Sequence, residues 1–247
     1  MNTETLEKMR LLRLWGMYHA FKTSMESNDT NILTADEMIS ELVNSEWDDR
    51  QNRNIERYVR NARFRYSATI EQIDYSGQRG LDKNLVYRLA EGDFIRKKED
   101  LFITGSTGTG KSYLASAIGY QACQLGFKVL YANTTKLMAA LKMAKADGSV
   151  VKELLKIEKQ DLLILDDFGI QPLDQQSRAS LLDIIEDRHG KRSTIITSQL
   201  PVSGWYEIIG DLTVADAILD RIVHQAIRIE LSGESLRKKS KKATAAE

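Results

Sequence analysis

The stretch Gly105-Ser-Thr-Gly-Thr-Gly-Lys-Ser112 matches the phosphate-binding pattern G-x-x-x-x-G-K-[ST]. The apolar run Leu101-Phe-Ile-Thr104 precedes it and is typical of a buried strand, and a helix-forming stretch from Ser112 to Leu125 follows it. A chance match in a glycine-containing turn would lack this strand–loop–helix order, which is the context that the motif requires. We therefore expect the backbone N–H groups of the loop, at the N-terminus of the helix, to bind the phosphates of a nucleotide.

Two side chains of this loop have expected roles of their own. Lys111 is predicted to reach the β- and γ-phosphates, and the Ser112 hydroxyl is predicted to ligate Mg²⁺. The residues expected to bind the nucleotide, ATP, are Gly105, Ser106, Thr107, Gly108, Thr109, Gly110, Lys111, Ser112 and Tyr113.

A pair of carboxylates ends a second apolar run, Asp161-Leu-Leu-Ile-Leu-Asp166-Asp167. Four continuous apolar residues suit a central parallel strand, and open α/β sheets bind ligands at the carboxyl ends of such strands. We expect Asp166 to hold Mg²⁺, directly or through water, and Asp167 to orient or deprotonate the attacking water. Paired acids favour a hydrolase, whereas a small-molecule kinase needs only the first. The alternative is a strand that ends at a solvated polar turn.

Composition limits the class of protein. The chain has 247 residues, 42% of them hydrophobic, with 35 basic and 35 acidic side chains, so any nucleic-acid binding must come from a local patch. The single cysteine, Cys123, allows no disulfide framework, which fits a reducing cytoplasm. The N-terminus lacks the features of a signal peptide and no apolar run approaches 18 residues, so we expect a cytoplasmic protein that does not contact a membrane.

The pattern along the chain predicts four segments. Residues 1–66 are expected to form a helical N-terminal domain for DNA binding or oligomerisation, with a capping box at Thr34-Ala-Asp-Glu37. Residues 67–98 are a connector that ends in one helix from Lys83 to Ile95. Residues 99–236 are expected to form the nucleotide-binding domain, and residues 237–247 a basic, disordered tail.

Strands and helices alternate through residues 99–236, which predicts an α/β fold with a parallel sheet covered by helices on both faces. The expected strands are 101–104, 128–132, 162–165, 193–198 and 227–231. The expected helices after the first are 135–145, 150–158, a helix capped by Asp174 that runs to Arg188, and 214–225.

Several segments together resemble the AAA+ ATPases and, within them, the IstB-like transposition helpers, which are close relatives of the DnaC-like helicase loaders. Besides the phosphate loop and the acid strand, the segments are Leu11-Leu-Arg-Leu-Trp-Gly-Met-Tyr18, Glu46-Trp-Asp-Asp-Arg50, Ser193-Thr-Ile-Ile-Thr-Ser-Gln-Leu-Pro201, Leu219-Asp-Arg-Ile222 and Gly233-Glu-Ser-Leu-Arg237. The resemblance covers nearly the whole chain and implies an AAA+ P-loop core, an Mg²⁺-dependent ATPase activity and an ATP-dependent homo-oligomer.

The resemblance also implies roles for three residues. Gln199 would sense the γ-phosphate from the strand between the phosphate loop and the acid strand, unless it only ends that strand before Pro201. Arg221 would act as an arginine finger on ATP bound by a neighbouring subunit. Its alternative is a solvated arginine paired with Asp216 or Asp220.

The third residue, Arg237, would be a second nucleotide sensor. Two departures from the family pattern bear on these roles. The second acid is Asp167, where Glu is commoner, so the water must lie nearer the strand. The chain also has no room for a C-terminal lid domain after the last expected strand, which weakens the role of Arg237.

An arginine stripe marks the candidate DNA-binding surface. Arg50, Arg53, Arg57 and Arg60 recur at i, i+3, i+7 and i+10, with Arg63 and Arg65 beside them. Six arginines against one glutamate give residues 50–65 a net charge of +5. Such a face can neutralise phosphates of duplex DNA largely independently of sequence. The alternative is a solvated cationic face.

Together these features predict an ATP-dependent, DNA-binding regulator of transposition. With ATP it would oligomerise on duplex DNA and hand a target site to a transposase. The nearest alternative is a DnaC-like helicase loader, although the stripe has no aromatic platforms for single strands. A small-molecule kinase and a non-hydrolysing, ATP-gated binding module are the other readings.

Overall fold

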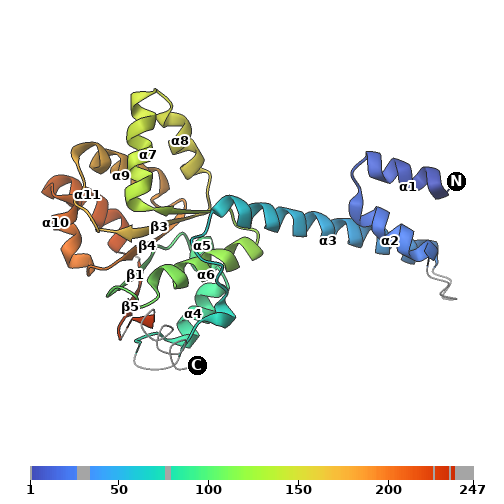
Figure 1. Ribbon diagram of the computed structural model, residues 1–247, viewed down its shortest axis with the longest axis horizontal. Helices are drawn as coiled ribbons and strands as arrows, with labels where there is room; N and C mark the ends of the chain where they lie inside the picture. Colours follow the sequence, from blue (N-terminus) through green and yellow to red (C-terminus); the bar gives the residue numbers. More distant parts are fainter. Residues whose placement is uncertain (1, 27–33, 76–78, 225, 234, 237–247) are drawn as a thin grey trace, which may run out of the picture. The chain divides into compact units, whose positions relative to one another are not determined.

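The computed structural model describes residues 2–26, 34–75, 79–224, 226–233 and 235–236 (Figure 1). The chain divides into two compact units, Met1–Arg57 and Tyr58–Glu247. The expected domain boundary at residue 66 falls inside the second unit, because Tyr58, Phe64 and Tyr66 pack against the core of that unit. Arg237 and the basic tail lie outside the described residues.

The first unit contains three helices in its described part. They are α1 (Asn2–Leu11), α2 (Trp15–Glu26) and α3 (Ala35–Ala62), whose last residues belong to the second unit. The capping box predicted at the start of α3 is confirmed: the Thr34 N–H donates to the Glu37 carboxylate at 2.8 Å, and the Glu37 N–H donates to the Thr34 hydroxyl at 3.3 Å. Each side chain thus satisfies an N–H group that the helix leaves without a partner.

Helices α2 and α3 touch at Gly16. A Cβ atom placed on Gly16 would lie 2.2 Å from the Ser45 carbonyl oxygen, so only glycine allows this approach. Next to it, the buried Glu46 carboxylate accepts hydrogen bonds from the Gly16 and Met17 N–H groups at 2.9 and 3.3 Å. Glu46 therefore caps the N-terminus of α2 from the neighbouring helix, where a negative charge is favourable.

The second unit is built on a parallel sheet of five strands in the order β2-β3-β4-β1-β5. The strands are β1 (Leu101–Gly105), β2 (Val129–Asn133), β3 (Leu162–Phe168), β4 (Ser193–Ser198) and β5 (Ile227–Leu231). All five predicted strands are confirmed. The order places β4 between the phosphate-loop strand and the acid strand, as the family resemblance implies.

Helices cover both faces of this sheet (Figure 1). One face packs against η1 (Ile70–Gln72), α4 (Lys83–Ala90), α5 (Asp93–Lys97) and α6 (Lys111–Gln124). The other packs against α7 (Thr134–Ala146), α8 (Val150–Glu158), α9 (Gln175–Arg188), η2 (Val202–Gly204), α10 (Trp205–Ile209) and α11 (Leu212–Val223). The predicted α/β fold, a parallel sheet with helices on both faces, is confirmed, and no lid domain follows β5 in the described residues.

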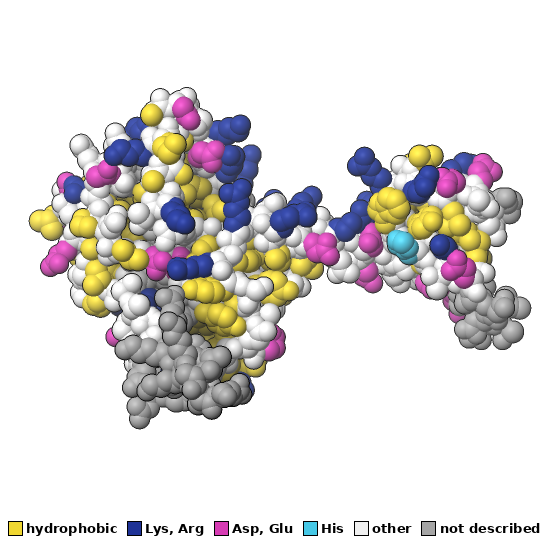
Figure 2. Space-filling view, viewed as in Figure 1, with side chains coloured by type: hydrophobic (Ala, Val, Ile, Leu, Met, Phe, Trp, Pro, Cys, Tyr) yellow, Lys and Arg dark blue, Asp and Glu magenta, His cyan; other side chains and the backbone are white. Residues whose placement is uncertain are grey.

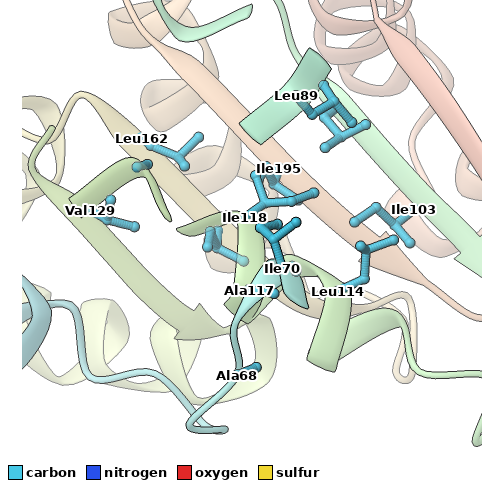
Figure 3. Close-up of a cluster of buried hydrophobic side chains, with 14 of the residues drawn as sticks. Ala68, Ile70, Leu89, Ile103, Leu114, Ala117, Ile118, Val129, Leu162 and Ile195 are labelled. Carbon is cyan, nitrogen blue, oxygen red and sulfur yellow. The ribbon is translucent and has the colours of Figure 1, made fainter. Parts of the chain in front are cut away.

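Alternation along the strands divides the core into these two layers. Leu101 and Ile103 of β1 enter the cluster shown in Figure 3, together with Leu162 and Ile195 of neighbouring strands. Phe102 points to the opposite face, because successive side chains of a strand alternate between the two sides. Both faces of β1 and β3 are buried by these layers, which explains why residues 101–103 and 162–165 are continuous apolar runs.

Two helix predictions have different outcomes. Asp174 caps α9 as expected, because its carboxylate accepts the Ser177 N–H at 2.8 Å. The single helix expected from Lys83 to Ile95 is wrong, since it breaks into α4 and α5 at Gly92, whose φ is 78°. A left-handed residue cannot continue an α-helix. No helix in the described ranges is long and apolar enough to cross a membrane.

Candidate nucleotide site and arginine helix

A cavity of about 350 Å³ opens at the carboxyl ends of β1, β3 and β4. Parallel α/β sheets bind their ligands at this edge. The residues that line the cavity are Arg65, Tyr66, Thr107, Gly108, Gly110, Lys111, Ser112, Tyr113, Asp167, Ile170, Gln199 and Leu236. The structure thus brings together the phosphate loop, one acid of the pair and Gln199, which are far apart in the sequence.

The phosphate loop takes a conformation that its glycines permit. Gly105, Gly108 and Gly110 have φ angles of 142°, 86° and 92°, a region that other residues adopt at a cost. Lys111, the first residue of α6, is buried, and its ammonium group donates to the Gly105 and Ser106 carbonyl oxygens at 2.7 and 2.8 Å. The cation is therefore held beside the loop at the start of the helix, where anions are favoured.

Asp166 lies one layer beneath the cavity and is fully buried. Its carboxylate accepts hydrogen bonds from the hydroxyl groups of Tyr131 and Thr197, the latter at 2.5 Å. Arg65 approaches the same carboxylate at 3.4 Å. Burial and the hydrogen bond to Asp166 raise the pKa of Tyr131, so this hydroxyl remains a donor. These contacts fix the position of the carboxylate.

Asp167, in contrast, faces the cavity. Its φ is 60°, and the register between β3 and β4 shifts between Leu165 and Phe168, so the two acids lie in an irregularity of the sheet. The Asp167 carboxylate accepts the Asn133 amide at 3.1 Å and Arg65 at 3.0 Å. Strained backbone that turns a side chain towards a cavity is common at functional sites.

The predicted Mg²⁺ ligands fit the ion only in part. Ser112 and Asp167 present oxygen atoms to the cavity, the ligand type that Mg²⁺ prefers. Asp166, the predicted ligand, lies behind Asp167 with its oxygens already bonded, so it would act through water or after Arg65 moves. Within the described residues, no group of three or more His, Cys, Asp or Glu side chains could hold a metal. Phosphate oxygens would have to complete the coordination.

Comparisons with known proteins agree with this geometry. The model of the family of IstB-like ATP-binding proteins matches residues 7–244. The chain belongs to this family. The insertion sequence ATP-binding protein y4pL of Sinorhizobium fredii is 45% identical over 238 residues, 96% of this chain and 97% of its own. The ATP-binding protein of insertion sequence IS21 from Pseudomonas aeruginosa is 32% identical over 225 residues, 91% of this chain and 84% of its own.

Among solved structures, the crystal structure of DnaI is similar with a TM-score of 0.58 and 25% identity, over 67% of this chain and 92% of that one. The resemblance noted from the sequence, to IstB-like AAA+ proteins with loader-like relatives, is therefore confirmed.

Gln199 and Arg221 occupy different places in this IstB-like chain. Gln199 follows β4 and lines the cavity, where its carbonyl oxygen accepts the Thr107 hydroxyl at 2.7 Å. Arg221 lies on α11 and is not among the residues that line the cavity. It donates to the Ala217 carbonyl oxygen and pairs with Glu186 at 2.9 Å, not with Asp216 or Asp220, the partners named in the alternative to the finger role.

Gln72, Arg79 and Leu236 also contribute to the site and could not be assigned to it from the sequence. The Tyr113 hydroxyl donates to the Gln72 side chain at 3.1 Å, and Arg79 donates to the Thr109 carbonyl oxygen, so the connector packs against the phosphate loop. Leu236 lines the cavity, and its N–H donates to the Gly108 carbonyl oxygen at 3.0 Å. These contacts join segments that are far apart in the sequence. The sequence gives a signal only for Asn133 and Thr197, which lie at or near the carboxyl ends of β2 and β4.

The arginine stripe forms part of α3, whose basic side chains, all of them arginine, are dark blue in Figure 2. Arg50 pairs with Glu46 at 2.7 Å and Arg53 pairs with Asp49 at 2.7 Å, both within one helical turn. Arg57 donates to the Asn54 side chain at 2.9 Å. The net charge of +5 counted for residues 50–65 leaves out Glu46 and Asp49, which precede this segment. Because these two acids pair with Arg50 and Arg53, the effective charge of the stripe is below +5.

Two of the six arginines do not continue the stripe. Helix α3 ends at Ala62, and Arg63 follows with a φ of 58°. The chain then turns, and Arg65 lies in the nucleotide cavity beside Asp166 and Asp167. The DNA-binding role expected of Arg65 does not agree with this position, because its guanidinium group is engaged with the acids.

Proposed function

We propose that this chain binds and hydrolyses Mg²⁺·ATP and, as an ATP-dependent, DNA-binding regulator, prepares a target site for a transposase. The single observation that carries the proposal is the cavity that unites Lys111, Ser112, Asp167 and Gln199. The family, whose relatives are ATP-binding proteins of insertion sequences, supports the link to transposition.

The residues of the cavity suit hydrolysis. The loop N–H groups and Lys111 would bind the phosphates, and Mg²⁺, when bound, would neutralise charge that develops on them. Asp167 reaches the cavity with a carboxylate that can accept a proton from water. Gln199 has an amide that can hydrogen-bond both that water and the γ-phosphate. Asp166 would support the metal side of the site from beneath.

Arg221 would act on ATP bound by another subunit. It is not among the residues that line its own cavity, yet it is about one-third exposed on α11. A planar, permanently charged guanidinium suits transition-state charge on phosphate. The proposal therefore includes a homo-oligomer in which the pair with Glu186 opens so that Arg221 reaches the adjacent nucleotide.

The arginines of α3 would bind duplex DNA through its phosphates, in the cytoplasm, where ATP and chromosomal DNA are both present. A helicase loader is the second candidate, since the fold of the core also resembles that of the DnaC helicase loader. That likeness lies in the AAA+ core, which helicase loaders and transposition helpers have in common. The relatives found by sequence come from insertion sequences, which favours the role in transposition.

One experiment tests the whole proposal. The purified protein is mixed with ATP and Mg²⁺, without DNA, with duplex DNA or with single strands, and both oligomer mass and phosphate release are measured. We expect duplex DNA to promote assembly and turnover more than single strands do. A preference for single strands would favour the loader, and assembly without phosphate release would indicate a non-hydrolysing binding module.

A further inference from the structure

Arg65 occupies the centre of the acid pair. Its Nη1 atom lies 3.0 Å from the Asp167 carboxylate and 3.4 Å from the Asp166 carboxylate. The Arg65 side chain is 43% exposed, whereas Asp166 is inaccessible and Asp167 is 20% exposed. A single, partly exposed cation therefore reaches two less exposed anions from the cavity side.

The ring of Tyr66 supports the guanidinium group in this place. The central carbon of the Arg65 guanidinium lies 5.5 Å from the centre of the Tyr66 ring, within range of a cation–π contact. Tyr66 in turn lies 6.1 Å from Tyr113 of α6, ring centre to ring centre. Partial burial lowers the pKa of Arg65, but the charges of Tyr66 and Asp167 raise it on balance, so the side chain remains a cation.

The position of Arg65 in the chain connects its contact with the acids to the end of α3. Only Arg63 and Phe64 separate it from Ala62, the last residue of α3. Phe64 packs into the core of the second unit, edge to face with Tyr131, while the Tyr131 hydroxyl donates to Asp166. The turn that follows the arginine helix is thus fixed to the acid strand by Phe64 and by Arg65.

The acids need a positive counter-charge, and two cations can supply it. Two carboxylates so close together repel each other unless a cation lies between them. Arg65 does so in this structure, and Mg²⁺ seeks the same oxygen atoms. The two cations compete, because a carboxylate lone pair that accepts an N–H group cannot also bind the metal.

We propose that Arg65 is a positioning residue of the nucleotide site that serves as the counter-charge of Asp166 and Asp167, and that Mg²⁺·ATP displaces it. This inference rests on the proposed binding of Mg²⁺·ATP and states what that binding does to the segment after α3. The turn after α3 changes its contacts when nucleotide binds, so the arginine helix is linked to the state of the ATP site.

The test compares Arg65→Gln with Arg63→Gln in the full chain. Arg63 is exposed and two residues away, which makes it a matched loss of one charge. Binding of a fluorescent, non-hydrolysable ATP analogue is titrated with Mg²⁺. With Arg65→Gln, half-maximal binding should need roughly threefold to tenfold less Mg²⁺, the scale of a partly exposed ion pair with one buried partner. Arg63→Gln and the charge-preserving Arg65→Lys should stay close to wild type.

A second measurement follows the wild-type protein directly. Mg²⁺ with the analogue should increase hydrogen exchange of residues 62–68, and EDTA should reverse the increase. An unchanged Mg²⁺ requirement in Arg65→Gln, or weaker binding at every Mg²⁺ concentration, would overturn the inference. The second result would assign Arg65 to the phosphates instead. If wild type and Arg63→Gln both fail to bind the analogue, the proposed function itself fails.

Discussion

Charged side chains meet in two settings in this protein, at the carboxyl edge of the sheet and along α3. At the sheet edge, Asp166 is inaccessible and its partners Tyr131 and Thr197 hold it from two neighbouring strands. Along α3, Arg50 and Arg53 are 56% and 43% exposed and pair with acids of their own helix. The first arrangement is fixed by packing, whereas solvent screens the second.

The difference teaches what each region can do alone. A buried, fully bonded carboxylate keeps its geometry whether or not a ligand is present, so a substitution there should have a large effect that salt does not change. Exposed arginines are held in one position only when they bind a partner of opposite charge. Substitutions of these arginines should therefore lower the affinity for that partner in small steps, and the size of each step should depend on ionic strength.

The largest effect is expected from Lys111→Ala. The phosphates lose their buried cationic partner, so ATP affinity should fall by about 10²-fold or more, at low and at moderate salt alike. Equilibrium titration with labelled ATP measures the loss. Lys152→Ala, an exposed lysine of α8, is the control and should bind normally. Retained micromolar affinity in Lys111→Ala would contradict the assignment of the phosphate loop.

The next effect is expected from Asp167→Asn. The amide keeps the shape of the side chain but cannot accept a proton, so phosphate release should fall by roughly 10²-fold while ATP binding persists. Asp183→Asn, an exposed acid of α9, is the control. Near-normal turnover in Asp167→Asn would assign the proton acceptor to another group.

Arg221→Ala tests a residue that belongs to neither setting, because its side chain is about one-third exposed but is proposed to act on a phosphate bound in a cavity. ATP binding by a single subunit should remain near normal, while hydrolysis and ATP-dependent assembly fail. Mixtures of Arg221→Ala with Lys111→Ala should partly regain activity, because one supplies an intact cavity and the other an intact finger. Mixtures that never exceed the sum of the separate activities would argue against action between subunits.

The smallest effect per residue is expected from α3. Replacement of Arg53, Arg57 and Arg60 by Gln should lower duplex affinity for every sequence alike. The slope of log affinity against log salt should flatten by up to about 2.7, or about 0.9 for each phosphate contact. The ion pair of Arg53 with Asp49 should reduce its share.

The control for the α3 variant replaces Lys83, Lys97 and Lys98, which lie in or beside α4 and α5, by Gln. It removes the same charge from another surface and should leave the slope unchanged. If both triple variants behave alike, the DNA site does not lie on α3.

Local patterns predicted the fold and much of the cavity. Apolar runs flanked by turn residues placed the central strands, because buried parallel strands must be apolar on both faces, whereas alternating apolar and charged residues placed the edge strand β5. The pattern G-x-x-x-x-G-K-[ST] predicted the loop at residues 105–112, and Asp167 and Gln199 were placed at strand ends that the parallel order brings together. Breaks in helices at glycine were harder to predict. Gly92 divides the segment from Lys83 to Ile95 into two helices, although the residues on either side of it favour a single helix.

Contacts between distant segments could not be predicted in the same way. Arg65 was assigned to the DNA-binding surface because it lies beside the stripe in the sequence, yet α3 ends at Ala62 and the chain turns at Arg63. The hydrogen bonds from Tyr131 and Thr197 to Asp166 depend on strand order and on the irregularity of β3. Neither appears in the residues around the acids themselves.

The phosphate-loop pattern leaves position 108 open to any residue, but this fold does not. A Cβ atom on Gly108 would lie 2.2 Å from the Ser235 hydroxyl oxygen and 2.7 Å from its Cβ atom, and its φ of 86° adds strain. Glycine at this position therefore accommodates Ser235 as well as the turn of the loop. An engineer who exchanged the loop for another of matching pattern would loosen Ser235 and Leu236 without substituting them, and would see that change as altered proteolysis near residue 236.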